Sequence, residues 1–224
     1  IEYEWLPAYE NWLQRWYLPL STKYAVHSAQ KIIAVSEFTK RQLVERLGAD
    51  ERKIQVVHEG VGEQRSVTSF QRLEVVKGFG LKPKKYLLFV GTIQPRKNLE
   101  RLIEAFKYFK GLKLVIAGKW GWGYERVKQL ISDQRLVIAT GYVDDITRQV
   151  LLENALVYVQ PSITEGFGLP VLEAMRAGVP VASSGGGALA EVVGEAGELF
   201  DPFDVDDMRN KIKLSMGNKK LMIK

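Results

Sequence analysis

Two adjacent cations, Arg96 and Lys97, stand between an apolar run at residues 86–90 and a helical pattern that begins at Asn98. Cations beside the start of a helix form an anion site, because the first amide groups of the helix point their hydrogens toward the same place. Such a site suits phosphate. The alternative is two solvated charges at a turn. The pattern favours a phosphate-binding loop over residues 91–98.

Two carboxylates follow a later apolar run. Glu165 lies in a loop with Gly166 and Gly168, and Glu173 lies one turn inside the next helical pattern. The glycines let a ligand approach the backbone closely, and carboxylates accept hydrogen bonds from sugar hydroxyls. Two carboxylates also fit glycoside hydrolysis by an acid and a nucleophile. The basic loop disfavours this alternative, because a hydrolase acting on neutral sugars would not need it.

Two further motifs are weaker candidates. Residues 118–123 are rich in glycine but lack the G-x-G-x-x-G spacing of dinucleotide-binding loops, so a turn with two exposed tryptophans is preferred. Asp204 and Asp206 form an Asp-x-Asp pair that could bind Mg²⁺. They also precede a helical pattern, where aspartate caps the helix and stabilises its dipole. Capping is the favoured explanation.

The composition excludes several kinds of site. The chain has 224 residues, of which 46% are hydrophobic and 26% charged, an ordinary balance for a globular protein. It has no cysteine and two histidines, which excludes disulfide scaffolds, cysteine-ligated metals, thiol nucleophiles and multi-histidine metal sites. No stretch reaches the ~18 apolar residues of a membrane span, and the acidic N-terminus does not resemble a signal peptide. We expect an intracellular, cytoplasmic protein.

The charge is unevenly distributed. Residues 1–62 carry equal numbers of basic and acidic side chains, so the whole excess of +6 lies in residues 63–224. A basic excess favours anionic partners such as phosphorylated ligands, nucleic acids or acidic lipids, with a solvated surface as the alternative. Nucleic-acid binding has no support beyond charge and exposed aromatic residues, and we expect no nucleic-acid partner.

Apolar runs alternate with helical patterns from residue 86 onward. The runs are continuous in valine, isoleucine and leucine, which is typical of strands buried on both faces of a parallel sheet. Strands are expected at residues 86–90, 112–117, 136–139, 156–159, 179–182 and, more weakly, 198–200. Helices are expected at residues 70–79, 98–109, 124–131, 145–154, 170–177, 188–193 and 204–216. This order predicts a doubly wound α/β domain that binds ligands at the carboxyl ends of its strands.

The N-terminal part has a different pattern. Four aromatic residues share one helical stripe: Trp5, Tyr9, Trp12 and Trp16. Burial of this stripe is the preferred interpretation, and contact with a membrane or a partner is the alternative. Short strands are expected at residues 31–35 and 54–57, and Gly60 and Gly62 indicate a hinge or linker.

The motifs together resemble the family 4 glycosyltransferases, which are retaining enzymes of the GT-B fold. The resemblance rests on residues 90–98 and on residues 165–175, in which Glu165 and Glu173 match the family's E-x7-E pair. Shorter matches lie at residues 178–181, 191–194 and 201–202. Most of the chain, from residue 32 to residue 216, is covered.

The resemblance implies that residues 63–224 form a Rossmann-like nucleotide-sugar-binding domain, and that residues 1–62 are the end of an N-terminal acceptor domain. Arg96, Lys97 and Glu165 are the implied catalytic residues: the cations would hold the diphosphate and stabilise its departing charge, and the carboxylate would bind the donor sugar. The implied donor-binding residues are Gly91, Thr92, Tyr142, Val143, Gly166, Phe167, Gly168, Leu169 and Glu173, with Tyr142 and Val143 at the nucleobase and Glu173 at the ribose. Such enzymes need no metal or other cofactor.

The sequence departs from the family pattern at three places. Thr92 stands where many relatives have the phosphate-binding arginine, so Arg96 would substitute for it. Residues 59–62 read Glu-Gly-Val-Gly where the family usually has Asn-Gly-Val-Asp. The chain is too short for two full domains, and neither His27 nor His58 fits the position of the histidine that relatives place at the reaction centre. We expect a piece of a larger transferase that is inactive by itself.

The resemblance predicts transfer of a hexose to a glycan or lipid-linked glycan acceptor in polysaccharide biosynthesis. The loop at residues 92–98 is similar to that of mannosyltransferases that use GDP-mannose, with UDP-glucose as the alternative donor. A second hypothesis is a non-catalytic subunit for nucleotide-sugar binding or assembly. The aromatic N-terminal helix adds peripheral contact with the inner face of a membrane as an expectation.

Overall fold

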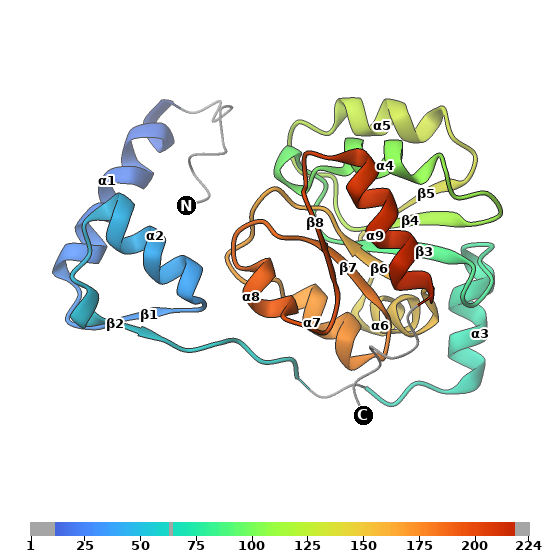
Figure 1. Cartoon of the computed structure of the whole chain (residues 1–224), viewed down its shortest axis with the longest axis horizontal. Helices are drawn as coiled ribbons and strands as arrows, with labels where there is room; N and C mark the ends of the chain where they lie inside the picture. Colours follow the sequence, from blue (N-terminus) through green and yellow to red (C-terminus); the bar gives the residue numbers. More distant parts are fainter. Residues whose placement is uncertain (1–11, 63–64, 218–224) are drawn as a thin grey trace. The chain divides into compact units, whose positions relative to one another are not determined.

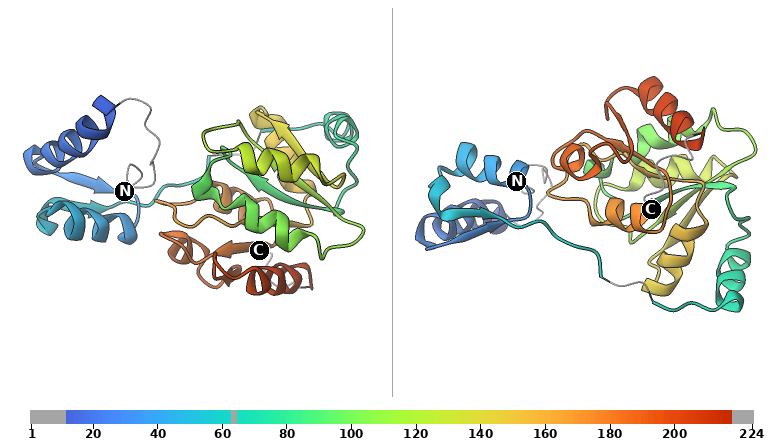
Figure 2. Two further views of the ribbon diagram at one scale, coloured as in Figure 1. Left: turned by 90° about the horizontal axis from the view of Figure 1, so that it is seen from above. Right: turned by 60° about the horizontal axis from the view of Figure 1, so that its bottom comes forward.

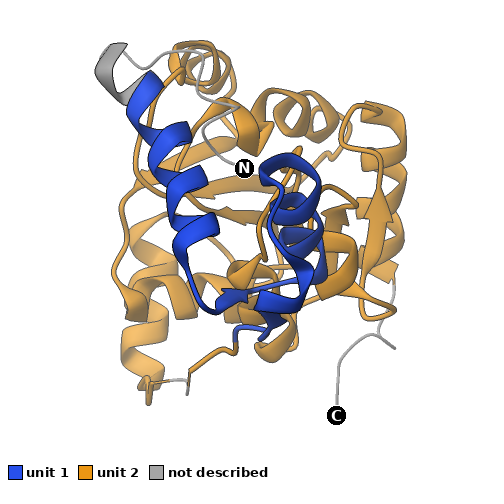
Figure 3. Cartoon of the chain, turned by 90° about the vertical axis from the view of Figure 1, so that its left-hand side faces the viewer, with its two compact units in different colours: residues 1–59 blue, residues 60–224 orange. Residues whose placement is uncertain are grey.

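The computed structural model describes residues 12–62 and 65–217, with side chains from residue 16 onward (Figure 1). The chain divides into two compact units, Ile1–Glu59 and Gly60–Lys224 (Figure 3). The sequence placed the boundary after residue 62, in the same glycine-containing segment. The assignment of one unit to an acceptor and of the other to a donor remains a prediction.

The larger unit is built on one parallel sheet. Its strands are β3 (Tyr86–Val90), β4 (Lys113–Ala117), β5 (Val137–Gly141), β6 (Val157–Gln160), β7 (Val181–Ser184) and β8 (Glu198–Phe200). Their order across the sheet is β5-β4-β3-β6-β7-β8, and every neighbouring pair is parallel. All five residues of β3 are buried, as expected for a central strand covered on both faces. The predicted doubly wound α/β fold is confirmed.

Helices cover both faces of this sheet (Figure 2). One apolar core includes residues of α4 (Leu99–Phe106), α5 (Glu125–Ser132) and α9 (Val205–Gly217). The other includes residues of α3 (Ser69–Gly78), α6 (Asp145–Asn154), α7 (Leu169–Arg176) and α8 (Leu189–Val193). Strand residues alternate between the cores: Leu87 and Phe89 belong to the first, and Leu88 and Val90 to the second. This alternation follows from the two-residue period of a strand.

The helix and strand bounds differ from prediction mainly at the ends of elements. The strand expected at residues 179–182 is observed as β7, Val181–Ser184. Pro180 has no amide hydrogen to donate to a neighbouring strand, so the regular ladder begins after it. The Asp204 carboxylate accepts hydrogen bonds from the amides of Asp206 and Asp207 at 2.9 and 3.0 Å, which confirms the predicted helix cap.

The smaller unit has a small core of its own. Its elements are α1 (Trp12–Ser28), β1 (Ile32–Ala34), α2 (Glu37–Leu47), the 3-10 turn η2 (Glu51–Lys53) and β2 (Ile54–Val56). The two strands pair in parallel. Ser36 caps α2 by accepting a hydrogen bond from the amide of Thr39 at 3.0 Å, and Gly48 ends the helix in the left-handed conformation. The core consists of Val26, Ala34, Leu47, Ala49 and Ile54.

The predicted aromatic stripe is only partly visible. Trp5 and Tyr9 lie outside the described residues, as does the side chain of Trp12. Trp16 is 67% exposed, so the preferred interpretation of burial is wrong for this residue. Tyr24, two helical turns further along α1, is also exposed. Within the part of the chain that the structure describes, none of the helices combines the length and apolar character that a membrane crossing requires.

Candidate functional site

The point where the sheet reverses its winding lies between β3 and β6. The chain leaves β3 for β4 on one side, whereas it leaves β6 for β7 on the other. The loops after these two strands therefore diverge, and open α/β sheets bind ligands where the loops diverge in this way. The loop after β3 carries Arg96 and Lys97, and the loop after β6 carries Glu165. Topology alone thus brings these three residues to the usual ligand-binding edge.

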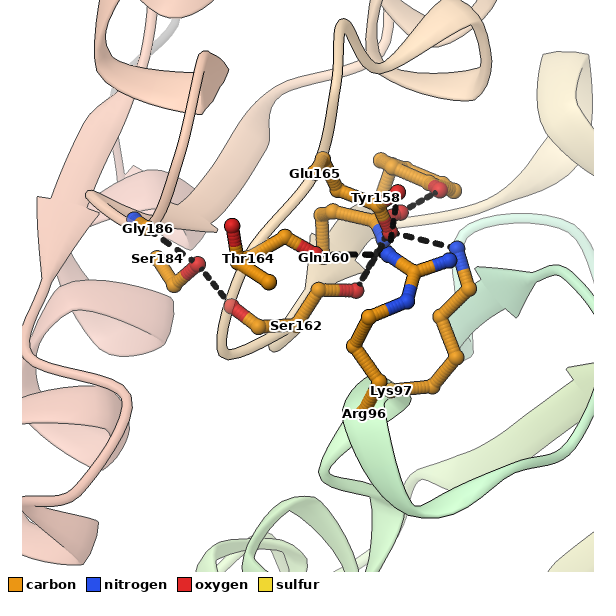
Figure 4. Close-up of polar contacts among 9 residues, drawn as sticks. All are labelled: Arg96, Lys97, Tyr158, Gln160, Ser162, Thr164, Glu165, Ser184 and Gly186. Atoms are coloured by element: carbon orange, nitrogen blue, oxygen red, sulfur yellow. Dashed lines mark hydrogen bonds and ion pairs between the residues drawn. The ribbon is translucent and has the colours of Figure 1, made fainter. Parts of the chain in front are cut away.

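The side chains of these three residues meet (Figure 4). The Arg96 Nη1 atom donates to Glu165 Oε2 at 2.7 Å, and Lys97 Nζ forms an ion pair with Glu165 Oε1. Each of the three side chains is between 11% and 13% exposed. A single carboxylate therefore bridges the guanidinium and the ammonium group in a site that is mostly shielded from water.

Glu165 accepts two more hydrogen bonds from neutral donors. Ser162 Oγ donates to its Oε1 at 2.7 Å, and Gln160 Nε2 donates to the same oxygen at 3.1 Å. Burial by itself raises the pKa of the Glu165 carboxyl, but the charges of Lys97 and Arg96 and the hydrogen bonds from both outweigh it. The pKa therefore lies below its ordinary value, and the carboxylate is ionised at neutral pH.

Backbone contacts join the loops on the two sides of the winding reversal. The amide of Ile163 donates to the Arg96 carbonyl at 2.9 Å, and Arg96 Nη1 also donates to the Thr164 carbonyl at 2.6 Å. Asn98 Nδ2 donates to the Pro161 carbonyl at 3.0 Å. These bonds fix the cation loop relative to the carboxylate loop.

Asn98 is absent from the predicted site residues, although it ends the predicted phosphate-binding loop and begins a predicted helix. It is 4% exposed and has a left-handed backbone with φ of 56°. Its Nδ2 reaches a third loop by donating to the Pro202 carbonyl at 2.7 Å, and its Oδ1 accepts from Arg101 at 2.9 Å. The positive φ suits asparagine better than most residues.

The loop after β7 holds the backbone of Glu165, and the sequence analysis did not predict it as part of the site. The amide of Ala188 donates to the Glu165 carbonyl at 2.9 Å, and Ser184 Oγ donates to the Ser162 carbonyl. Gly187 has a φ of 68°, and a Cβ atom there would lie 2.3 Å from the Glu165 carbonyl oxygen. Only glycine fits this approach. The three consecutive glycines 185–187 were the available signal.

Glu173 has different neighbours from Glu165. Its Oε1 pairs with Arg148 Nη2 at 3.3 Å, and its Oε2 is buried without a hydrogen-bond partner among the described residues. Burial raises the pKa of this carboxyl, Arg148 lowers it and Asp145 raises it, with a net increase. A cavity of about 250 Å³ adjoins Glu173 and is lined by Val61, Gly62, Arg65, Asp145, Arg148, Gln149, Leu152, Arg176 and Ala177. Three of the four predicted charged residues thus meet directly, and Glu173 faces this cavity.

The predicted nucleobase residues lie in the loop after β5. Tyr142 is 68% exposed, and Lys119 Nζ lies 4.8 Å from the centre of its ring. Val143 is partly buried against the apolar core. The neighbouring loop after β4 differs from prediction, since Trp120 is exposed but Trp122 is only partly so. The Tyr142 ring is therefore exposed beside the Lys119 ammonium group, in a loop at the carboxyl ends of the strands.

The remaining predicted residues line the ends of two loops. Gly91 directly follows β3, and Thr92 is exposed. Gly166 is exposed, whereas the Phe167 side chain is buried and serves packing. Gly168 precedes α7 with a φ of 118°, and Leu169 is the first residue of that helix. Among the described residues there is no group of three or more histidine, aspartate or glutamate side chains arranged to hold a metal.

Two family models match the sequence. The model of glycosyl transferases group 1 matches residues 71–223, and the model of glycosyltransferase family 4 matches residues 2–65. The chain is 32% identical over 209 residues to O-antigen chain mannosyltransferase B of Escherichia coli, covering 89% of this chain and 55% of that protein. It is 33% identical over 200 residues to D-inositol 3-phosphate glycosyltransferase of Mycolicibacterium smegmatis, covering 84% and 45%. The chain spans about half the length of these curated relatives.

Solved structures share the fold. A glycosyltransferase from Rickettsia africae superposes with a TM-score of 0.76 at 22% identity, covering 88% of this chain and 57% of that chain. HepE from Anabaena superposes with a TM-score of 0.79 at 19% identity, covering 92% and 58%. Since the group 1 model alone covers most of the sequence, this chain belongs to the group 1 glycosyltransferases and carries the C-terminal domain of a family 4, GT-B-type enzyme.

Proposed function

We propose that this chain holds the nucleotide-sugar site of a retaining hexosyltransferase that acts on a glycan or lipid-linked glycan. The observation that carries the proposal is the meeting of Arg96, Lys97 and Glu165 where the sheet reverses its winding. Two clustered cations suit a diphosphate, and a carboxylate within reach of them suits the hydroxyls of the attached sugar.

The main chemical role of the two cations would be to stabilise the departing diphosphate. When the bond between the anomeric carbon and the diphosphate oxygen breaks, negative charge grows on that oxygen. Arg96 and Lys97 stabilise the charge in a shielded site, where such interactions are stronger than in water. The acceptor hydroxyl attacks the anomeric carbon from the face that the diphosphate leaves, and its proton passes to the departing diphosphate. No protein nucleophile and no metal is required.

The charge state of Glu165 argues against the glycosidase alternative. A glycosidase needs one carboxyl group that carries a proton to give to the leaving group. Glu165 accepts from two cations and two neutral donors, and its pKa is lowered. Glu173, whose pKa is raised, pairs with Arg148 beside the cavity of about 250 Å³, which Glu165 does not line. This arrangement favours ligand binding over acid catalysis by Glu165.

The identity of the donor is proposed from the relatives. O-antigen chain mannosyltransferase B and the serotype-specific mannosyltransferase WbdA, both from Escherichia coli, favour mannose as the sugar. The loop at residues 92–98, which is similar to that of mannosyltransferases that use GDP-mannose, favours GDP as the nucleotide. HepE from Anabaena has been crystallised with UDP-glucose, which supports UDP-glucose as the alternative donor. Isothermal titration with GDP, UDP and inorganic pyrophosphate tests the site directly. We expect GDP to bind below millimolar concentration; a flat titration with all three at millimolar concentration would overturn the proposal.

The alternative is a non-catalytic subunit that binds nucleotide sugars. Such a subunit would use the same two cations and carboxylate to bind the nucleotide sugar, without transferring the sugar. An assay of mannose transfer from GDP-mannose, with and without a full-length N-terminal domain, separates the two hypotheses. Transfer by this chain alone eliminates the alternative. Cytoplasmic location and contact with a membrane remain predictions.

A further inference from the structure

Strand β6 and the loop that follows it carry three buried polar residues. Tyr158 and Ser162 have no exposed surface, and Gln160 is 1% exposed. Tyr158 and Gln160 are two residues apart in β6, so the pleat of the strand directs both to one side, and Ser162 follows in the loop. Buried polar side chains destabilise a fold unless they are hydrogen-bonded. Their presence at the edge of the site calls for a function other than packing.

These residues form a directed chain of hydrogen bonds that ends on Glu165 (Figure 4). Tyr158 donates to Gln160 Oε1, Gln160 Nε2 donates to Ser162 Oγ at 2.7 Å, and Ser162 Oγ donates to Glu165 Oε1 at 2.7 Å. The ionised carboxylate only accepts hydrogen bonds, so Gln160 must turn its NH₂ group toward it. The Gln160 oxygen then faces Tyr158, which must donate.

We propose that Tyr158, Gln160 and Ser162 are a positioning relay that holds the Glu165 carboxylate in place when Arg96 and Lys97 turn to an anionic ligand. The identity of that ligand as a diphosphate rests on the proposed function, whereas the relay itself does not. Both cations now bond to Glu165. A ligand that accepts the hydrogen bonds of both cations would leave the buried Glu165 carboxylate with fewer donors. A carboxylate that loses donors in this way moves or takes up a proton. The neutral donors Gln160 and Ser162 prevent this.

The test is a carbon-13 NMR titration of the Glu165 carboxyl in the free chain, with its signal assigned by E165Q. Loss of one hydrogen-bond donor changes the pKa of the charged acceptor by about one to two units. We therefore expect Ser162→Ala to raise the pKa of Glu165 by about one to two units, and Ser162→Thr, which keeps the hydroxyl, to restore it. Arg96 and Lys97, the charged groups in contact with Glu165, remain unchanged in these variants.

Matched controls exist for two members of the relay. Ser183 is as deeply buried as Ser162, but its hydroxyl donates to the Ser184 carbonyl, so Ser183→Ala should not move the titration. Tyr86 is as deeply buried as Tyr158, but it donates to the Leu151 carbonyl at 2.6 Å. Tyr158→Phe should raise the pKa of Glu165 less than Ser162→Ala does, because its effect passes through Gln160, and Tyr86→Phe should leave it unchanged.

A second titration with saturating pyrophosphate tests the purpose of the relay. We expect pyrophosphate to raise the pKa of Glu165 further in Ser162→Ala than in the unaltered chain. The relay is overturned if Ser162→Ala matches Ser183→Ala, if Tyr158→Phe matches Tyr86→Phe, or if Ser162→Thr fails to restore the pKa. A positioning role in ligand binding is overturned if pyrophosphate raises the pKa of Glu165 equally in Ser162→Ala and in the unaltered chain. Failure of pyrophosphate to bind would count against the proposed function and leave the free-chain result standing.

Discussion

Arg96 and Glu165 are 69 positions apart in the sequence, yet Arg96 Nη1 donates to Glu165 Oε2 at 2.7 Å. Lys97 pairs with the other oxygen of the same carboxylate. Without a ligand, the site therefore neutralises one of its two positive charges from within. An anionic ligand must share the cations with Glu165, so affinity for a diphosphate depends on three coupled side chains.

Removal of the ammonium group should weaken binding of a diphosphate. Charge-assisted hydrogen bonds contribute about 1.5–3 kcal/mol each, which corresponds to a loss of roughly 10- to 100-fold in affinity. We expect Lys97→Ala to reduce the affinity for GDP by this factor in isothermal titration. Lys110→Ala removes an exposed lysine outside the site and should leave the affinity unchanged. Equal losses in both variants would mean that only overall charge attracts the ligand.

Neutralisation of Glu165 should destabilise the free protein and make its stability depend on anions. Removing one partner of a shielded ion pair costs about 3 kcal/mol, because the remaining charges are left uncompensated. We expect Glu165→Gln to lower the free energy of unfolding by about this amount in urea, and pyrophosphate to restore more stability to it than to the unaltered chain.

The control for this variant is Glu198→Gln. Glu198 forms an ion pair with Lys211, with 3.2 Å between its Oε2 atom and Lys211 Nζ, and neither residue belongs to the loops of the site. Glu198→Gln should lose less than about 1 kcal/mol. Its response to pyrophosphate should equal that of the unaltered chain. If Glu165→Gln gains no extra stability from pyrophosphate, the anion does not replace the carboxylate at the cations.

The two carboxylates should affect acid stability in opposite directions. The pKa of Glu165 is lower in the folded chain, so its stabilising contribution is present above about pH 4.3 and is lost as the pH falls through the folded pKa. The pKa of Glu173 is raised, so its charge destabilises the fold at neutral pH, and this penalty disappears as the pH falls through that raised pKa.

Glu173→Gln should therefore increase the free energy of unfolding at pH 7 and remove the part of the pH dependence that lies above pH 4.3. The same change should weaken nucleotide binding if Glu173 holds the ribose, while leaving the affinity for pyrophosphate unchanged. Urea titrations between pH 4 and pH 7 and calorimetry with GDP and pyrophosphate measure both effects. A variant that loses GDP and pyrophosphate affinity alike would place Glu173 at the diphosphate or show a general distortion.

Gly187 should tolerate no side chain. An added Cβ atom would lie 2.3 Å from the Glu165 carbonyl oxygen, and its φ is 68°. Gly111 has a similar φ of 76° with nothing within 4 Å, so it isolates the backbone effect. We expect Gly111→Ala to cost about 1 kcal/mol and Gly187→Ala at least about 3 kcal/mol, with loss of GDP binding. If both variants lose a similar free energy of unfolding in urea, the loop after β7 can shift to admit the added Cβ atom without disturbing Glu165.

Chelation of metals should not affect the ligand site. We propose that Arg96 and Lys97 supply the positive charge that a divalent cation supplies to diphosphates in other enzymes. GDP affinity measured with EDTA should therefore equal the affinity with added Mg²⁺ or Mn²⁺. A tenfold or greater gain with either metal would mean that the two cations are insufficient.

The sequence by itself determined the sheet and the residue types of the site. Continuous apolar runs such as residues 86–90 predicted the buried strands, because a strand covered on both faces has no polar side. The order of strands and helices predicted the doubly wound fold, and the loops after the strands at residues 86–90 and 156–159 predicted Arg96, Lys97 and Glu165 as site residues. These inferences needed only local pattern and the rule that ligands bind at the carboxyl edge.

Only the tertiary structure decided which side chains contact one another. Glu165 and Glu173 are both candidate ligand-binding carboxylates in the sequence, yet Glu165 is paired with two cations, whereas Glu173 is paired with Arg148 beside a cavity that Glu165 does not line. Asn98 and Gly187 owe their importance to loops distant in sequence, and no local pattern predicts a hydrogen bond or a close approach between such loops. The direction in which each carboxylate points and its distance from the cations are not given by the sequence, and they determine the pKa of each group.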